Sequence, residues 1–389
     1  APIVTYKSLV HQYEYFLPKV DVHTLGTGGG SKVRVDKATR SLRVGPDSAG
    51  ADPGPVCYGR GGTVPTTTDA DLVLGYLDPD NYAGGTMKLD HAAAAAALQK
   101  LADEIGMDLY EFASGVATIA EFQMADLIRK MTVTKGLDPR EFVVYAFGGA
   151  GPVHMGVAAR ELGVAKVIVP QGDTAAVWCA FGAASADILH VDEQVSIMSS
   201  PFELAKVNAM LENLHDKGRA HLTEDGVDAS RHQFRFSIDM RHRGQINEVE
   251  VNLDSGVLDQ AGLEQLRERF VARYEQLYGR GAALRGARLE MVTFRCRASA
   301  TSLKPKLVAA KELTDVIAAD AQTGTRDIYW AEWKKLAPTP IFNGYKLKPG
   351  NAIVGPCVVE TTTTSMVVHP NQRIAVDALG NFLIDPNWV

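Results

Sequence analysis

Three glycine-rich segments contain the residue types that could hold a charged ligand, and the clearest of them is Phe147–His154. This segment follows an apolar strand pattern at Phe142–Phe147 and precedes a helix pattern at Val153–Leu162. Glycine permits backbone conformations closed to other residues and lets a ligand approach without a Cβ in the way. The helix N–H groups favour a phosphate-bearing ligand, and Pro152 suits the first helical turn. From these residues alone, a ligand loop and a tight turn are equally good interpretations of Gly148, Gly149 and Gly151.

The second segment, residues 23–31, has four glycines in five positions. A plain β-hairpin turn is one interpretation. Few hairpins need so many glycines, however, whereas a backbone that wraps anionic oxygens does. His23, a candidate catalytic residue, and Thr24 would then add donors at its edges. The residues that we predict to bind nucleotide here are Gly28, Gly29, Gly30 and Ser31.

The third segment, residues 48–71, is rich in glycine and proline and reads as either a functional loop or a flexible insertion. Arg60 lies among glycines, which suits an anionic group, and Asp69 could bind Mg²⁺ or orient a nucleophile. Both are therefore catalytic candidates. Asp69 could equally cap a helix at Ala70–Leu77. Cys57 has no identifiable partner base, so we expect a buried thiol rather than a reactive one.

Other candidates are weaker. His154 either points toward a ligand or packs, and Arg241–Arg243 is typical of a solvated hairpin turn. We expect no metal ligands from this chain alone. Three residues belong either to the core or to a subunit contact: Trp178, Cys179 and Phe181.

The order of helix and strand patterns predicts three regions: an α/β region in residues 1–195, an α+β domain in 196–300 and a β-rich domain in 301–389. The sequence of strand, helix and strand ending at Lys166–Val169 predicts a parallel pair with a right-handed crossover. Further predicted helices are Ala92–Glu104, Asp108–Met131, Glu203–Asp225 and Leu258–Tyr278. Further predicted strands are Val20–Leu25, Lys32–Asp36, Ser41–Val44, Phe234–Met240, Asn247–Asn252, Asp327–Trp330, Ala352–Glu360, Ser365–Val368, Arg373–Val376 and Phe382–Ile384.

Composition is that of an ordinary globular protein of 389 residues, with 46% hydrophobic and 22% charged residues. The net charge of −6 gives no reason to expect nucleic acid or a membrane surface as a partner. No apolar stretch approaches membrane-spanning length, and no export signal is visible, so we expect a cytoplasmic location. Four widely separated cysteines predict reduced, mostly buried thiols.

Taken together, the three segments resemble the hydantoinase A/oxoprolinase family. Phe147–His154 is similar to its adenosine-side loop, and Arg243–Gln245 and Tyr278–Gly279 also fit. The similarity spans nearly the whole chain and is far more specific than any single glycine loop. The runs that carry it are Asp21–Ser31, Val44–Pro46, Ser48–Ala51, Pro53–Pro55, Cys57–Gly62 and Pro65–Ala70.

The resemblance implies an actin-like ATPase fold, in which ATP lies between two lobes, with Mg²⁺ as a further cofactor. It implies phosphorylation of a carbonyl or amide oxygen, or of bicarbonate, by ATP. Some such enzymes open cyclic amides, whereas others carboxylate ketones together with a hydantoinase B-type large subunit and often a small subunit.

One departure is large. The family carries two aspartate–glycine–glycine–threonine phosphate loops, and neither occurs here, so the chain resembles roughly the C-terminal 60% of such a subunit. The main phosphate and Mg²⁺ contacts would then come from the N-terminal half, and these residues alone should bind ATP poorly.

Within the family, His23 and the runs at 171–174, 180–183 and 187–190 look more like acetone or acetophenone carboxylase subunits than like hydantoinases. The first hypothesis is therefore an ATP-dependent ketone carboxylase subunit. The alternatives are an ATP-dependent cyclic amidase and a non-catalytic scaffold that holds partner subunits together.

Overall fold

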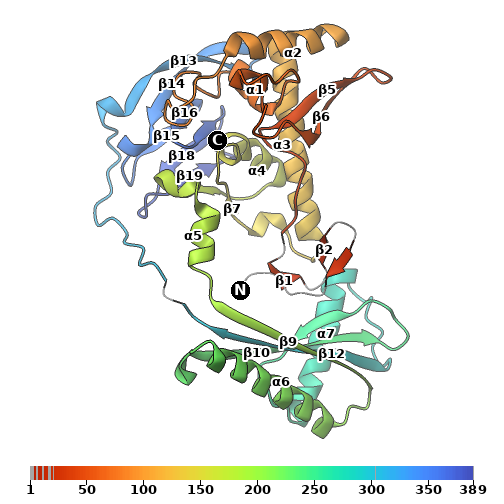
Figure 1. Ribbon diagram of the computed structural model, residues 1–389. Coiled ribbons are helices and arrows are strands. Elements are labelled where there is room, and N and C mark those ends of the chain that lie inside the picture. Colours follow the sequence, from red (N-terminus) through yellow and green to blue (C-terminus); the bar gives the residue numbers. More distant parts are fainter. Residues whose placement is uncertain are drawn as a thin grey trace. The chain divides into compact units, whose positions relative to one another are not determined.

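A computed structural model describes residues 22–302 and 304–388, together with 4–5, 8–10, 13–15 and 19–20 (Figure 1). The chain is a mixed α/β protein that divides into two compact units. Unit 1 comprises Ala1–Val22 and Ala183–Pro305, and unit 2 comprises His23–Gly182 and Lys306–Val389.

This division differs from the three predicted regions in two ways. A single strand, β9 (Ile188–Ser199), runs through the expected boundary at residue 195 and pairs inside unit 1. Residues 306–389 do not form a unit of their own, because β19 (Phe382–Asp385) pairs with β8 (Val167–Val169) of the central sheet of unit 2.

The central sheet of unit 2 has the strand order β15-β18-β19-β8-β7, with β7 (Val144–Tyr145) at the edge. β7 and β8 are parallel and are connected through α4 (Gly151–Leu162), which confirms the predicted parallel pair. The C-terminal strands extend this sheet in antiparallel register. They are β15 (Ala352–Val354) and β18 (Arg373–Val376), besides β19.

Local capping explains where the long helices of unit 2 begin. Asp90 accepts from Ala93 N at the start of α2 (His91–Ile105), and Asp108 accepts from Tyr110 N at the start of α3 (Leu109–Val133). Both helices were predicted. Their apolar sides enter a core that also contains α1 (Thr67–Val73).

A second sheet of unit 2 has the order β13-β14-β16-β17. The predicted strand Ala352–Glu360 is in fact two strands, β15 and β16 (Cys357–Glu360), which belong to different sheets. The other members are β13 (Gln322–Trp330), β14 (Lys335–Asn343) and β17 (Ser365–Val368). A separate hairpin of unit 2 consists of β5 (Ser31–Asp36) and β6 (Ser41–Ser48).

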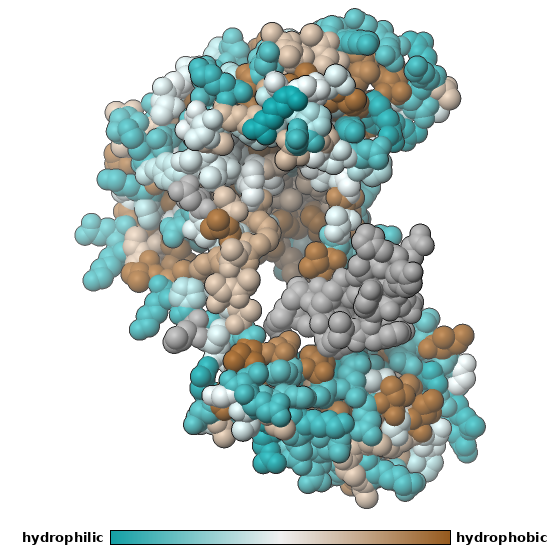
Figure 2. Space-filling view, viewed as in Figure 1, coloured by the Kyte–Doolittle hydropathy of each residue, from teal (hydrophilic) through white to brown (hydrophobic). Residues whose placement is uncertain are grey.

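Unit 1 is an antiparallel sheet in the order β11-β10-β12-β9, covered on one face by two helices (Figure 1). The helices are α6 (Leu204–Glu224) and α7 (Gln260–Tyr278), and the remaining strands are β10 (His232–His242), β11 (Val249–Asn252) and β12 (Leu289–Ala300). Figure 2 shows that the visible face of this unit is mostly hydrophilic, with several separate hydrophobic patches.

The remaining elements are short. Unit 2 contributes most of α5 (Trp178–Ala184), and no helix in the described part of the chain is long and apolar enough to cross a membrane. The predicted strand Val20–Leu25 was wrong for Val22–Leu25, which form no strand, and Asp21 lies outside the described residues. Short strands near the start are β1 (Val4–Thr5), β2 (Ser8–Val10), β3 (Tyr13–Tyr15) and β4 (Lys19–Val20). Short 3₁₀ helices are η1 (Val56–Tyr58), η2 (Pro139–Glu141), η3 (Gly172–Ala175), η4 (Ala229–Arg231), η5 (Ala319–Ala321) and η6 (Gly344–Lys346).

Candidate functional site

The glycine segments at residues 26–31 and 147–152 meet at the N-terminus of α1. Thr68 donates to the Gly29 carbonyl from both its backbone N (2.8 Å) and its Oγ1 (2.9 Å). A Cβ added to Gly29 would lie 2.7 Å from Thr68 Oγ1 and 3.9 Å from the Ala150 Cβ. A side chain at position 29 would therefore force Thr68 Oγ1 to move and would disturb its hydrogen bond to the Gly29 carbonyl, whereas the contact with Ala150 would be ordinary.

A turn from the C-terminal part of the chain closes on the same place. Thr364 Oγ1 donates to the carbonyls of Gly148 (2.8 Å) and Gly149 (3.3 Å). The turn lies between β16 and β17, more than two hundred residues away in sequence. Three segments that are far apart in the chain thus share one small region of unit 2.

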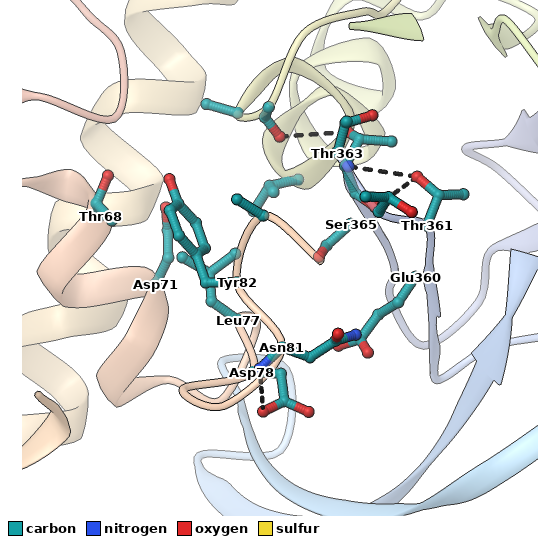
Figure 3. Close-up of a pocket in the computed structure, with 16 residues that line it drawn as sticks. Thr68, Asp71, Leu77, Asp78, Asn81, Tyr82, Glu360, Thr361, Thr363 and Ser365 are labelled. Atoms are coloured by element: carbon teal, nitrogen blue, oxygen red, sulfur yellow. Dashed lines mark hydrogen bonds between the residues drawn. The ribbon is translucent and has the colours of Figure 1, made fainter. Parts of the chain in front are cut away.

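Two of these segments, the loop at Gly149–Ala150 and the turn at Thr361–Thr364, line a cavity of about 280 Å³ together with residues 68–83 (Figure 3), whereas the predicted nucleotide-binding residues at 28–31 do not line it. Its wall on the α1 side includes Asp71 and Tyr82, whereas the opposite wall is the hydroxyl-rich turn between β16 and β17. The N-terminus of α4 lies at a third wall. The lining residues are Thr68, Asp71, Leu77, Asp78, Asn81, Tyr82, Ala83, Gly149, Ala150, Val153, Glu360, Thr361, Thr362, Thr363, Thr364 and Ser365.

The residues that line the cavity carry a net negative charge. Among the described residues that line the cavity there are three carboxylates and no lysine or arginine. Arg326 lies outside the lining but pairs with Glu360 (2.7 Å) and Asp78 (3.4 Å). One guanidinium therefore balances part of the charge of two carboxylates, and Asp71 has no such cation in the lining.

Behind Asp71 lies a buried histidine. His154 is 0% exposed, and its Nε2 lies 3.3 Å from Asp71 Oδ2 while its Nδ1 lies 3.4 Å from Glu121 Oε1. Burial alone lowers the pKa of His154, but the charges of Asp71 and Glu121 outweigh it and raise the pKa to about 10. His154 is therefore an imidazolium at neutral pH and belongs to the core, which resolves the two sequence interpretations in favour of packing.

Asp69 takes part in capping α1, as the sequence allowed, but from inside the helix: Thr66 is the N-cap and α1 runs from Thr67 to Val73 rather than from Ala70 to Leu77. Asp69 Oδ2 accepts from Thr66 N (2.7 Å) and Thr66 Oγ1 (2.9 Å), which closes a capping box at α1. Its carboxylate also accepts from Val56 N (3.2 Å) and Cys57 N (2.7 Å). Asp69 is 0% exposed and does not line the cavity, so it holds the proline- and glycine-rich loop against α1.

Of the other predicted site residues, some lie at the cavity and others lie away from it. Gly149 lines the cavity, Gly148 borders it through its carbonyl, and Gly151 is the first residue of α4. His23 and Arg60 are exposed and do not line the cavity. Their catalytic roles stay predictions.

Ser31 stabilises the turn in which it lies. Its Oγ accepts from Gly28 N (2.8 Å) and donates to the Gly26 carbonyl (3.3 Å). Gly30 accepts from Ala49 N through its carbonyl. The turn does not connect two strands of one hairpin, since β5 pairs with β6, so the hairpin interpretation of this segment was wrong.

Two sets of lining residues were missed by sequence reasoning. Asp71 lies two positions after Asp69 in the threonine-rich run that starts α1 and was passed over in favour of its neighbour. The four consecutive threonines Thr361–Thr364 are an unusual run that could have drawn attention to the turn between β16 and β17. Tyr82 was also missed, and its hydroxyl lies 3.1 Å from that of Tyr58.

The cysteines agree with the predicted buried thiols, with one exception. Cys57 is fully buried, and burial raises its pKa, so it is not a reactive nucleophile. Cys296 and Cys357 are also buried, whereas Cys179 is exposed. In the described part of the chain there is no group of three or more His, Cys, Asp or Glu residues that could hold a metal ion.

The remaining candidates lie away from the cavity. His242 is 3% exposed and packs against Phe270 and Tyr274, so the predicted solvated turn was wrong at that position. Of the two interpretations of Trp178, Cys179 and Phe181, the core was wrong, and the subunit contact stays a prediction. Trp178 and Phe181 are half-buried and stack with the exposed Tyr145, with 5.6 Å between the Tyr145 and Trp178 rings and 5.1 Å between the Trp178 and Phe181 rings, whereas Cys179 is exposed.

Nearly the whole chain matches known proteins. The family model described as hydantoinase/oxoprolinase matches residues 1–192, and the model of the hydantoinase/oxoprolinase C-terminal domain matches residues 200–383. The chain is 34% identical over 383 residues to caprolactamase subunit alpha of Pseudomonas jessenii, covering 96% of this chain and 54% of that protein. It is 32% identical over 393 residues to acetophenone carboxylase gamma subunit of Aromatoleum aromaticum, covering 98% of this chain and 53% of that protein.

The fold is also that of a solved relative. The crystal structure of ATP-dependent caprolactamase from Pseudomonas jessenii matches with a TM-score of 0.91 and 33% identity, covering 98% of this chain and 55% of that chain. The chain spans about half the length of the curated relatives it matches.

Proposed function

The chain belongs to the hydantoinase/oxoprolinase family, as its sequence resemblance predicted, and on that premise we propose that it forms the nucleoside side of an ATP site in a larger enzyme. The observation that carries this proposal is the cavity where the loop at Gly149, the α1 wall and the threonine turn meet. ATP would supply the phosphoryl group that activates a carbonyl or amide oxygen.

The cavity suits a base and ribose better than a triphosphate. Its volume of about 280 Å³ is slightly below that of most ligand pockets, which run from about 300 to 1,000 Å³. Its carboxylates repel phosphate oxygens, whereas its apolar residues, such as Leu77 and Val153, suit a flat ring. The partial positive charge at the N-terminus of α4 favours the phosphate end of the ligand beside Gly149.

The rest of the site would come from outside this chain. We propose an actin-like ATPase fold for the complete protein, and the parallel β7–α4–β8 unit supports it. The principal phosphate and Mg²⁺ contacts would come from the N-terminal half that the longer relatives carry. A hydantoinase B-type large subunit, and possibly a small one as in related carboxylases, would complete the enzyme.

Carboxylation of a small ketone, with bicarbonate as co-substrate, is the reaction that we propose first. The 32% identity to the acetophenone carboxylase subunit supports it. Hydrolysis of a cyclic amide is the second candidate, because the similarity to caprolactamase is equally extensive and includes a TM-score of 0.91. A scaffold role is the third, from a different class of protein.

Nucleotide binding is tested with Gly149→Val in the complete protein. A Cβ at Gly149 would meet only the Thr363 carbonyl, at 3.9 Å, so valine fits the fold while its methyl groups enter the cavity. The matched control is Gly324→Val, in a strand where an added Cβ has nothing within 4 Å. We expect ATP affinity to fall only in Gly149→Val, and unchanged affinity in that variant would refute the proposed site.

The reaction is tested on the assembled enzyme. Fixation of labelled bicarbonate into acetone or acetophenone, dependent on ATP, supports the carboxylase. ATP-dependent ring opening of 5-oxoproline or caprolactam without fixation supports the amidase instead. If neither reaction occurs and no ATP binds, the scaffold function remains.

A further inference from the structure

A buried trio of ionisable groups stands behind one wall of the cavity, and the proposed ATP site has so far given it no role. His154 lies between Glu121 and Asp71, and all three side chains are at most 5% exposed. Only Asp71 of the three lines the cavity. Its Oδ2 faces His154, and its Oδ1 is buried without a hydrogen-bond partner in the described part of the protein.

An unpaired carboxylate oxygen in a buried position is costly unless a ligand supplies the missing donor. The alternative of a metal ion has no support here, because the described residues offer no group of three or more suitable ligands. In the free protein a water molecule can supply this donor, and in the bound state a hydrogen-bond donor on an organic ligand can replace it.

The depth of Asp71 indicates which end of a nucleotide it would meet. Asp71 is 2% exposed, whereas Asn81 and Ala83 on one side of the cavity and Thr362 and Thr363 on the other are exposed and therefore mark its mouth. A ligand that carries phosphates keeps them toward the mouth and toward the α4 N-terminus. Its base would then lie deepest, beside Asp71 and the ring of Tyr82 (Figure 3).

We propose that Asp71 accepts a hydrogen bond from the exocyclic 6-amino group of adenine and thereby selects adenine over 6-oxo purines. The inference rests on the proposed ATP site. A 6-oxo purine would place a carbonyl oxygen against a carboxylate, so two acceptors would face each other without a proton between them.

His154 acts in this arrangement as a positioning residue. Its imidazolium lies between two buried carboxylates and attracts Asp71 through Oδ2 at 3.3 Å without a hydrogen bond between them, which leaves Oδ1 as the acceptor for a ligand. Asp71 itself contributes the discrimination, because it alone of the three reaches the cavity.

The first experiment needs no substitution. Equilibrium binding of three probes to the complete wild-type protein is compared: ATP, inosine triphosphate with a 6-oxo group, and purine riboside triphosphate with neither group. We expect affinity to fall in the order ATP, purine riboside triphosphate, inosine triphosphate, with at least about tenfold between first and last. Equal affinity for all three overturns the selection by Asp71 but leaves the ATP site standing. Failure of every probe to bind overturns both.

The second experiment assigns the selectivity to the residue. In Asp71→Asn, His154 can hold the amide oxygen while the amide NH₂ faces the base, so inosine triphosphate should gain affinity relative to ATP by about tenfold or more. The control is Glu360→Gln, which removes one negative charge from the same cavity at a residue that is already paired with Arg326. That variant should change the affinities of all probes alike. An unchanged ratio in a folded Asp71→Asn protein overturns the inference, and if that variant does not fold, the wild-type series decides.

Discussion

Replacing His154 by glutamine should make the protein less stable and should remove a specific pH dependence of its stability. Glutamine keeps a donor near Asp71 but has no charge, so two buried carboxylates at 3.3 and 3.4 Å lose their shared cation. The attraction between unit charges at that separation is about 5 kcal/mol at an effective dielectric constant of about 20. Desolvation offsets part of it, so we expect a loss of about 3–5 kcal/mol in the free energy of unfolding.

The pH dependence follows from the raised pKa of His154. The folded protein binds this proton up to about pH 10, whereas an unfolded histidine loses it near pH 6.5. Stabilisation by His154 is thus complete below about pH 6.5 and is lost progressively as the pH rises toward 10. The slope is at most about 1.4 kcal/mol per pH unit for one proton.

Urea unfolding of the wild type and of His154→Gln at several pH values between 6.5 and 8 measures this slope. The window matters because the pKa values of the buried thiols are raised too, and they add a slope of the same sign once an unfolded cysteine ionises near pH 8.5. Subtracting the variant from the wild type isolates His154. Identical slopes would show that the buried imidazole is neutral, and the charge argument for the trio would fail.

Three further predictions concern buried charged groups and the cysteines. Asp69→Ala should cost about 2–4 kcal/mol in unfolding by urea, since it leaves backbone donors of the loop and of α1 unpaired; a cost below about 1 kcal/mol would contradict the capping role. Arg295 is 4% exposed and pairs with Glu193, Asp239 and Glu250, so Arg295→Ala should lower the free energy of unfolding by about 3–5 kcal/mol. Part of this loss should disappear at low pH, where the unpaired carboxylates are protonated, and the exposed control Arg285→Ala should change stability little. A thiol reagent should modify Cys179 rapidly in the native protein, and rapid native labelling of more than one thiol would contradict the burial of Cys57, Cys296 and Cys357.

The elements that sequence reasoning found are those whose signals are local. The helices beginning after Asp90 and Asp108 have a capping residue directly before a periodic apolar pattern, and both ends agree to within a few residues. The parallel pair around Phe147–His154 was found for the same reason, because strand, turn and helix signals follow one another directly.

The elements that it missed depend on distant partners. β12 has arginines at positions 295 and 297, which argue against a strand until their partners are known. Glu193 from β9 and Asp239 from β10 are the partners of Arg295, about a hundred and about fifty residues away in the chain. Ser237 from β10 and Glu250 from β11 are the partners of Arg297. β9 itself contains the polar run Asp192–Gln194, which does not look like a strand without its partners in β12. A domain boundary was therefore predicted inside this strand.

The candidate site shows the same limit. The sequence predicted that the loop at Gly149 lies at a ligand site, and this loop lines the cavity, but the turn Thr361–Thr364 and Asp71 are brought together by the sheets of unit 2 rather than by any motif. Asp69 was preferred to Asp71 because an aspartate after threonines has a recognisable pattern. Only the hydrogen bonds of the fold reveal that Asp69 is fully occupied as a cap while Asp71 has a free oxygen.

Glycine in these loops allows close backbone packing, and this role does not depend on a bound phosphate. A Cβ at Gly29 would collide with Thr68 Oγ1 at 2.7 Å, and one at Gly26 would lie 2.7 Å from the Pro46 Cβ, so both positions bring backbone segments into contact. The chemistry of the ligand is then decided by the walls that this contact creates, and those walls are negative at Asp71. On our proposal, base recognition and phosphate binding therefore belong to different parts of the enzyme. A substitution at Asp71 should change which nucleotide is chosen while leaving the dependence of activity on Mg²⁺ unaltered, and a joint change in both would mean that the phosphates also lie against this wall.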